Sequence, residues 1–205
     1  MAAILEADVR IAADSGAEAL LNRGILPDLV VGDFDSLDPA AKERLIAEGV
    51  PLVTYPTRKD RTDLHIAIHA ASERGAASIT FLGLLGGPRT DHGLAGMLLL
   101  ARDEFAHLDL RVIDGHAEIH VARDEVTLRG RPGEYVSLVS LALTTHGVTT
   151  HGLEYPLVSA TLTFGDSLGV SNVLEHYEAR VSLESGLLLV VHQHTVDPKQ
   201  PEKVE

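Results

Sequence analysis

Short apolar runs alternate with segments of helical pattern through the first 115 or so residues. The runs predict strands at 9–13, 29–31, 52–55 and 78–83. Between them, helical period or capping residues predict helices at 17–22, 38–48 and 62–74, and a further helix follows His92. Continuous Val/Leu runs are typical of parallel strands that helices cover on both faces. The pattern predicts a mostly parallel, layered α/β sheet domain.

In the predicted helix at 62–74, four apolar residues fall at helical spacing and would form its core stripe: Leu64, Ala67, Ile68 and Ala71. From residue 110 the pattern changes to short alternating runs between turn residues, at 110–113, 117–121, 125–128, 134–143, 160–164, 178–183 and 187–194. Such spacing indicates an all-β domain, a sandwich or barrel, and we expect the sandwich. The first of these runs would complete the N-terminal sheet.

The change in pattern sets the domain boundaries. We predict an α/β domain over 1–115, a β-domain over 116–196 and a loose tail over 197–205, where polar residues and prolines predominate.

Acidic side chains follow several of the predicted strands. Asp33 and Asp35 come directly after the strand at 29–31, and the same position after other strands holds Asp14, Asp60, Asp63 and Asp91. Because ligands bind beyond the carboxyl ends of parallel strands, these carboxylates would face one cleft. Carboxylates gathered in this way suit Mg²⁺, which proteins hold by one or two carboxylates together with substrate phosphates. Each Asp taken alone is equally well explained as a helix cap or turn residue.

One strand–helix junction combines glycines with a cation. Gly86 and Gly87 would let backbone N–H groups approach a phosphate, and Arg89 supplies a forked positive group. The segment has neither the Rossmann nor the P-loop pattern, and a tight turn explains the glycine pair equally well.

Composition narrows the function. The 205 residues carry a formal net charge of −13, which argues against a nucleic-acid partner. The chain contains no Cys, which excludes disulfides, thiol catalysis and Cys-ligated zinc. No apolar run reaches about 18 residues and no signal pattern opens the chain, so we expect a cytoplasmic protein without a membrane span.

Six motifs in order carry a resemblance: Asp14-Ser15-Gly16, Gly32-Asp33-Phe34-Asp35-Ser36, Lys59-Asp60-Arg61-Thr62-Asp63, Gly86-Gly87-Pro88-Arg89-Thr90-Asp91-His92, Gly152-Leu153-Glu154-Tyr155-Pro156-Leu157 and Ser167-Leu168-Gly169-Val170-Ser171-Asn172. Together they resemble the thiamine pyrophosphokinase family from about residue 12 to 192. The resemblance implies transfer of pyrophosphate from ATP to the hydroxyethyl group of thiamine, giving thiamine diphosphate and AMP. It also implies a homodimer whose sites lie between subunits.

The resemblance implies roles for individual residues. Asp33, Asp35 and Asp63 would bind Mg²⁺ and, with Arg89, form the catalytic set. ATP would be held by Lys59 and Arg89 and by a pocket that includes Asp14, Asp60, Gly86, Gly87 and Asp91. Ser171 and Asn172 would meet the aminopyrimidine edge of thiamine. Arg89 could instead pair with Asp91, and the Ser-Asn pair could be a turn between strands.

Two departures from the family pattern stand out. Pro88 adds one residue to the usual Gly-Gly-Arg spacing, and almost nothing precedes the first Asp motif, where the family has a further strand. These departures support one alternative, a sensor that binds thiamine or ATP without turnover. A second alternative, on the same α/β frame, is another Mg²⁺-dependent nucleotide pyrophosphohydrolase.

Two histidine pairs have spacings that permit a metal: His65 with His69 on a helix, and His192 with His194 on a strand. No third ligand of fitting spacing is evident for either pair. A surface pair is the commoner explanation.

Overall fold

A computed structural model describes residues 2–55, 60–87 and 89–195. The chain forms two compact units, Met1–Ile79 and Thr80–Glu205. The predicted loose tail, 197–205, lies outside the described residues, as do Lys59 and Pro88. No helix in the described ranges is long and apolar enough to cross a membrane.

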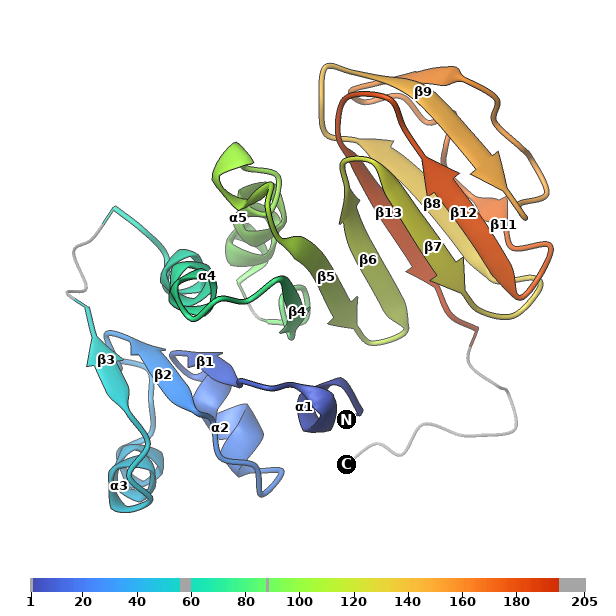
Figure 1. The fold of residues 1–205 in the computed structure, drawn as a ribbon. Coiled ribbons are helices and arrows are strands. Elements are labelled where there is room, and N and C mark those ends of the chain that lie inside the picture. Colours follow the sequence, from blue (N-terminus) through green and yellow to red (C-terminus); the bar gives the residue numbers. More distant parts are fainter. Residues whose placement is uncertain (1, 56–59, 88, 196–205) are drawn as a thin grey trace. The chain divides into compact units, whose positions relative to one another are not determined.

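The first unit is built on a parallel sheet of three strands, in the order β1 (Ile11–Ala13), β2 (Leu29–Gly32) and β3 (Leu52–Thr54). Four helices accompany it: α1 (Ala2–Glu6), α2 (Gly16–Leu21), α3 (Pro39–Ala47) and α4 (Asp63–Glu73). Figure 1 shows helices on both faces of this sheet. The first unit is therefore a three-layered α/β body.

Strand β2 shows why both faces are covered. All of its residues are buried, and successive side chains point to opposite faces. Val30 packs with residues of α2 and α3, whereas Leu29 and Val31 pack with residues of α4. A run of four buried residues therefore connects two separate apolar clusters.

The predicted core stripe of α4 is confirmed only in part. Ile68 is buried as predicted, but Leu64 is only half-buried, and the other buried residues are Ile66 and Ala70. Ile66 and Ala70 face the sheet. Ile68, two residues away from each, lies on another side of the helix. This helix is therefore buried on more than one side, which a single stripe does not anticipate.

The second unit is rich in β-structure. A six-stranded sheet has the order β11-β8-β13-β6-β5-β4, and a four-stranded antiparallel sheet has the order β10-β9-β12-β7. Their strands are β4 (Ser78–Leu82), β5 (Asp109–Asp114), β6 (Ala117–Ala122), β7 (Glu125–Arg129), β8 (Tyr135–Ser140), β9 (Thr144–His151), β10 (Ala160–Thr163), β11 (Asn172–Val173), β12 (Glu178–Ser182) and β13 (Leu188–Gln193). Helix α5 (Thr90–Leu99) and a 3₁₀ turn, η1 (Asp103–Phe105), connect β4 to β5.

One apolar cluster joins the two sheets of the second unit. The six-stranded sheet contributes Val136 and Leu138 from β8, and the four-stranded sheet contributes Ala179 and Val181 from β12. Each pair is spaced by two residues, as expected for one face of a strand. The two sheets therefore share a core in the manner of a sandwich (Figure 1).

The mixed α/β fold with a β-rich C-terminal part is confirmed, with several differences in its elements. The predicted strands at 78–83 and 110–113 join the six-stranded sheet instead of extending the parallel one. The predicted run at 134–143 ends at Ser140, and β9, which follows it, was not predicted. Strand β9 reads Thr-Thr-His-Gly-Val-Thr-Thr-His and lacks an apolar alternation. Its buried positions include Thr145 and Thr150, so polar residues occupy core-facing places.

Candidate active site

The loop after β2 separates two carboxylates with a buried aromatic ring. Phe34 is buried and belongs to the apolar cluster that includes Val30, while Asp35 is exposed. The Phe34 backbone is left-handed, with φ of 59°. The Asp35 backbone N–H donates to Asp33 Oδ1 at 3.2 Å, which closes a local turn. The ring thus anchors the loop while the flanking carboxylates stand at its outer side.

Asp14 reaches the same place from the end of β1. Its backbone N–H donates to the Val31 carbonyl at 2.8 Å, and its own φ is 47°, again left-handed. Gly32 permits this approach, because a Cβ on it would lie 3.2 Å from the Asp14 Cα. The Ser36 hydroxyl donates to Asp14 Oδ2. Two non-glycine residues in left-handed conformation at one junction indicate a site whose geometry the surrounding fold enforces.

The three carboxylates form a group, the acidic cluster Asp14, Asp33 and Asp35. One oxygen from each lies within 4.8 Å of the others. The pKa of Asp35 is raised, first by its side-chain hydrogen bond and charge interaction with Asp33, then by slight burial and by the charges of Asp14 and Asp63. Negative charge therefore accumulates at this cluster.

A divalent cation fits this chemistry. The donors are all carboxylate oxygens, which Mg²⁺ prefers. In the described residues, Asp14 Oδ1 is buried and has no hydrogen-bond partner. A buried carboxylate oxygen without a partner is costly unless a cation or donor meets it. The raised pKa of Asp35 reflects the same crowding of carboxylates, through its hydrogen bond to Asp33 and the charges of the neighbouring aspartates.

Asp63 opens α4 on the same unit. Thr62 is the N-cap, and its hydroxyl accepts from the His65 backbone N–H at 3.3 Å. This cap places the half-buried Asp63 in the first turn, from which its charge raises the pKa of Asp35. Asp60 is exposed in the turn before the helix. Lys59, predicted to hold the triphosphate, lies outside the described residues.

The glycine-containing junction belongs to the second unit. Gly86 and Gly87 are exposed, and the Leu85 backbone N–H just before them donates to Asp114 Oδ2 at 2.7 Å. Arg89 pairs with Asp91 through two parallel bonds, Nε to Oδ1 at 2.9 Å and Nη2 to Oδ2 at 2.6 Å. The Arg89 side chain lowers the pKa of Asp91 to about 2. The structure thus contains the alternative that the sequence left open, a pairing of Arg89 with Asp91.

Ser171 and Asn172 lie where β11 begins. Ser171 is exposed, with φ of 63°, and its backbone N–H donates to Ser137 Oγ at 3.0 Å. Asn172 is buried, and its side chain bonds the Tyr155 backbone on both sides, accepting from N–H at 3.0 Å and donating to the carbonyl at 2.7 Å. The Asn172 amide therefore ties the 152–157 loop to β11.

The comparisons with known proteins now decide the family. The model of "Thiamin pyrophosphokinase, catalytic domain" matches residues 2–112, and that of "Thiamin pyrophosphokinase, vitamin B1 binding domain" matches residues 116–188. The chain belongs to the thiamine pyrophosphokinase family.

Individual relatives agree with the family models. The chain is similar to the thiamine pyrophosphokinase of Bacillus subtilis, with 31% identity over 183 residues that cover 88% of this chain and 85% of the relative. The crystal structure of the B. subtilis protein aligns with a TM-score of 0.81, covering 91% of this chain and 87% of that one at 30% identity. That of Geobacillus thermodenitrificans thiamin pyrophosphokinase also gives 0.81, at 26% identity and with 95% and 91% covered.

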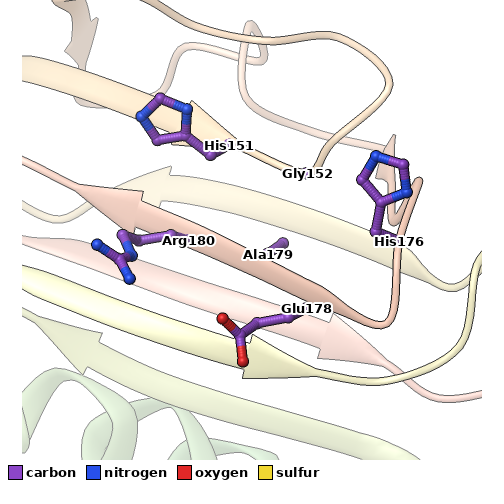
Figure 2. A pocket seen from close by; sticks show the side chains of 6 residues that line it. All are labelled: His151, Gly152, His176, Glu178, Ala179 and Arg180. Carbon is purple, nitrogen blue, oxygen red and sulfur yellow. The ribbon is translucent and has the colours of Figure 1, made fainter.

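In this thiamine pyrophosphokinase family member, Ser171 and Asn172 fall within the segment that matches the vitamin B1 binding domain. The same segment lines a cavity of about 300 Å³. Figure 2 shows His151 on β9 and Arg180 on β12, two strands that pair with each other, and His176 on the loop that leads into β12. A second cavity, of about 470 Å³, is lined by residues between Ala106 and Thr127. Among the described residues, none of those predicted for the site lines either cavity.

Two residues that hold parts of the candidate site in place were not predicted from the sequence. Ser36 holds Asp14, and Asp114 holds the segment before Gly86. Ser36 carried a signal, since it ends the Gly-Asp-x-Asp-Ser motif. Asp114 carried none, because the residues that it joins are 29 positions apart.

Proposed function

We propose that this chain transfers pyrophosphate from ATP to the hydroxyethyl group of thiamine, giving thiamine diphosphate and AMP. The observation that carries the proposal is the acidic cluster, in which Asp14, Asp33 and Asp35 converge within a chain of the thiamine pyrophosphokinase family. Because AMP is the product, the thiamine oxygen attacks the β-phosphorus of ATP, and the bond from that phosphorus to the oxygen of AMP breaks. Such transfer depends on positioning and on neutralising charge.

We infer that Asp33, Asp35 and Asp63 hold Mg²⁺, with Asp14 lining the same place. A bound Mg²⁺ would neutralise these carboxylates and the phosphate oxygens of ATP. The left-handed Asp14 and Phe34 and the Ser36 hydroxyl fix the carboxylates before substrate arrives, so little reorganisation is needed during the reaction. The raised pKa of Asp35 supports the inference, because a cation would remove the charge repulsion that causes it.

We propose further residues for contacts with ATP. Lys59, Asp60, Gly86, Gly87 and Asp91 would contact ATP. Arg89 would serve the transferred phosphates, and its paired carboxylate already fixes the plane of its guanidinium.

For thiamine, we propose Ser171 and Asn172. Ser171 is exposed and held in a left-handed conformation, which presents it at the surface of the second unit. Asn172 keeps one amide hydrogen for a ligand while its other groups bind Tyr155 and Val173.

We also propose functional domains at 1–115 and 116–196, supported by family models that meet between residues 112 and 116. A homodimer is proposed as well. Large apolar side chains on the surface of the second unit support it, among them Leu143, Phe164 and Tyr177.

The test is incubation of the full chain with ATP, Mg²⁺ and thiamine, with AMP and thiamine diphosphate measured together. Equal amounts of both are expected, and Asp35→Asn should abolish AMP formation while leaving the circular dichroism spectrum unchanged. Asp8→Asn is the matched control, because Asp8 is an exposed aspartate of the same unit, and it should retain full turnover.

The same assay separates the alternative functions. AMP formed equally well without thiamine would indicate a nucleotide pyrophosphohydrolase. Binding of thiamine or ATP without either product would indicate a sensor. Near-normal turnover in Asp35→Asn would contradict the metal assignment itself.

A further inference from the structure

Three metal-binding side chains meet at the end of β13, in the second unit, and take no part in the proposed transfer. His192 Nε2 lies 2.8 Å from Glu134 Oε2, and His194 Nδ1 lies 3.4 Å from the same oxygen. One donor atom from each of the three residues lies within 4.8 Å of the others. Glu134 is 58 residues from His192, so the sequence showed the histidine pair without this third ligand.

We propose that Glu134, His192 and His194 form a binding site for Zn²⁺. Two imidazole nitrogens and one carboxylate oxygen are a common donor set for this ion. With bonds of about 2.0–2.2 Å, tetrahedral zinc ligands stand about 3.4 Å apart, so the nitrogens and the oxygen need only small shifts. Mg²⁺ prefers oxygen ligands, so the two sites would select different ions.

The contacts around these residues resemble the outer shell of a metal site. The second ring nitrogen of His194, Nε2, lies 3.5 Å from Glu118 Oε2, and a carboxylate behind a ligating imidazole is the usual arrangement. The other oxygen of Glu134, Oε1, accepts from the Thr195 backbone N–H at 3.2 Å. Ligand orientation is therefore fixed without an ion.

The exposure of the three residues and the space beside them also fit a zinc site. Glu134 and His192 are 3% and 1% exposed, whereas the His194 side chain is 34% exposed and offers a route from solvent. Gly130 lies against the pair, and a Cβ on it would stand 2.7 Å from His192 Nε2. A side chain at residue 130 would fill the space beside two of the ligands.

A zinc ion here would act on structure. Glu134 is the residue just before β8, His192 lies on β13, its antiparallel neighbour, and His194 is the first residue after β13. The ion would fasten the two strand ends together, and its binding free energy would add to the stability of the fold.

The experiment is a Zn²⁺ titration of the full chain at neutral pH in excess Mg²⁺, which keeps the acidic cluster occupied. A chromophoric chelator reports affinity, and Co²⁺ substitution reports nitrogen coordination through its visible absorption. We expect one saturable site that raises the Tm. His194→Ala should weaken binding at least about 100-fold, and Glu118→Gln about 10-fold. His194 is partly exposed, so its removal leaves the core intact.

Two control variants make the result decisive. His176→Ala removes an exposed histidine of the same unit and should leave zinc affinity unchanged. His69→Ala removes half of the other histidine pair, whose rings stack at 5.0 Å on α4, and should also leave it unchanged. The proposal is wrong if the wild-type chain binds no zinc, or if His194→Ala binds it as tightly as wild type. It is equally wrong if His69→Ala, and not His194→Ala, loses the site.

Discussion

Two groups of side chains differ in what surrounds their carboxylates: the acidic cluster of the first unit, and the Glu134–His192–His194 group of the second. In the first, carboxylates face one another, and the pKa of Asp35 rises. In the second, burial acts to raise the pKa of Glu134, but hydrogen bonds from the Arg131 and Thr195 backbone and from His192 outweigh it, so the pKa is lowered.

The difference separates two kinds of site. In the acidic cluster the carboxylates repel one another, so a bound cation would stabilise it, and this suits the proposed role of a place where a charged substrate enters and leaves. The Glu134 group is already balanced by donors of its own unit, so it can stabilise the fold with or without an ion. The repulsion among its carboxylates thus makes the acidic cluster a candidate functional site, whereas the hydrogen-bonded Glu134 is typical of a structural one.

The largest effect should follow from Glu134→Ala, which leaves His192 buried without its carboxylate. Burial lowers the pKa of His192, so the variant leaves a neutral ring without its hydrogen-bond partner, and we expect a loss of about 1–3 kcal/mol in the free energy of unfolding. Urea unfolding followed by circular dichroism measures it. Glu178→Ala is the control: its exposed contact with Arg129, at 3.3 Å, should be worth less than about 1 kcal/mol. Equal losses in the two variants would contradict the claim that the Glu134 group stabilises the fold more than an exposed ion pair does.

Asp33→Asn should show the opposite pattern, a loss of activity without a loss of stability. Turnover should fall on the order of 10²–10³-fold, because a proposed ligand of the Mg²⁺ that would neutralise the reacting phosphates is lost. The Tm measured without Mg²⁺ should stay the same or rise slightly, because one of the mutually repelling charges is gone. The pKa of Asp35, followed by NMR, should fall towards its ordinary value. A drop in Tm that accounts for the lost activity would show that the cluster serves folding instead.

The smallest effect concerns Arg89 and Asp91. The pKa of Asp91 is lowered to about 2, so the pair's stabilisation is fully present above the ordinary value of 3.8 and is lost as the pH falls through about 2. Both side chains are exposed, so the contribution is small. Arg89→Ala should return the Asp91 pKa towards 3.8 in an NMR titration, whereas Arg129→Ala should leave it unchanged. An unaltered titration in Arg89→Ala would exclude the pairing in solution.

Sequence reasoning located the acidic cluster because one rule sufficed: the carboxyl ends of neighbouring parallel strands share an edge. Asp14 and Asp33 follow β1 and β2, which pair directly. The same rule could not foresee how Phe34 anchors the loop. A left-handed backbone at an aromatic residue is set by tertiary packing and not by local preference.

Other features required contacts that no local pattern encodes. The partnership of Glu134 with His192 joins distant strands, and β9 buries threonines where apolar residues were sought. The strands at 78–82 and 109–114 were recognised, but their apolar composition says nothing about which sheet they enter. Element type was therefore predictable where apolar residues mark it, which excludes β9, and sheet membership was not predictable.

The buried ring of Phe34 has a practical consequence for protein engineering. Because the ring anchors the loop, the exposed Asp35 can be exchanged without displacing the backbone, whereas the Asp33 side chain also accepts the Asp35 N–H and closes the turn. A library aimed at altered ion preference should therefore randomise position 35, restrict position 33 to side chains that still accept this hydrogen bond, and leave 34 untouched. Substitutions of Phe34 would instead remove the buried ring that anchors the loop and displace the side chains at positions 33 and 35.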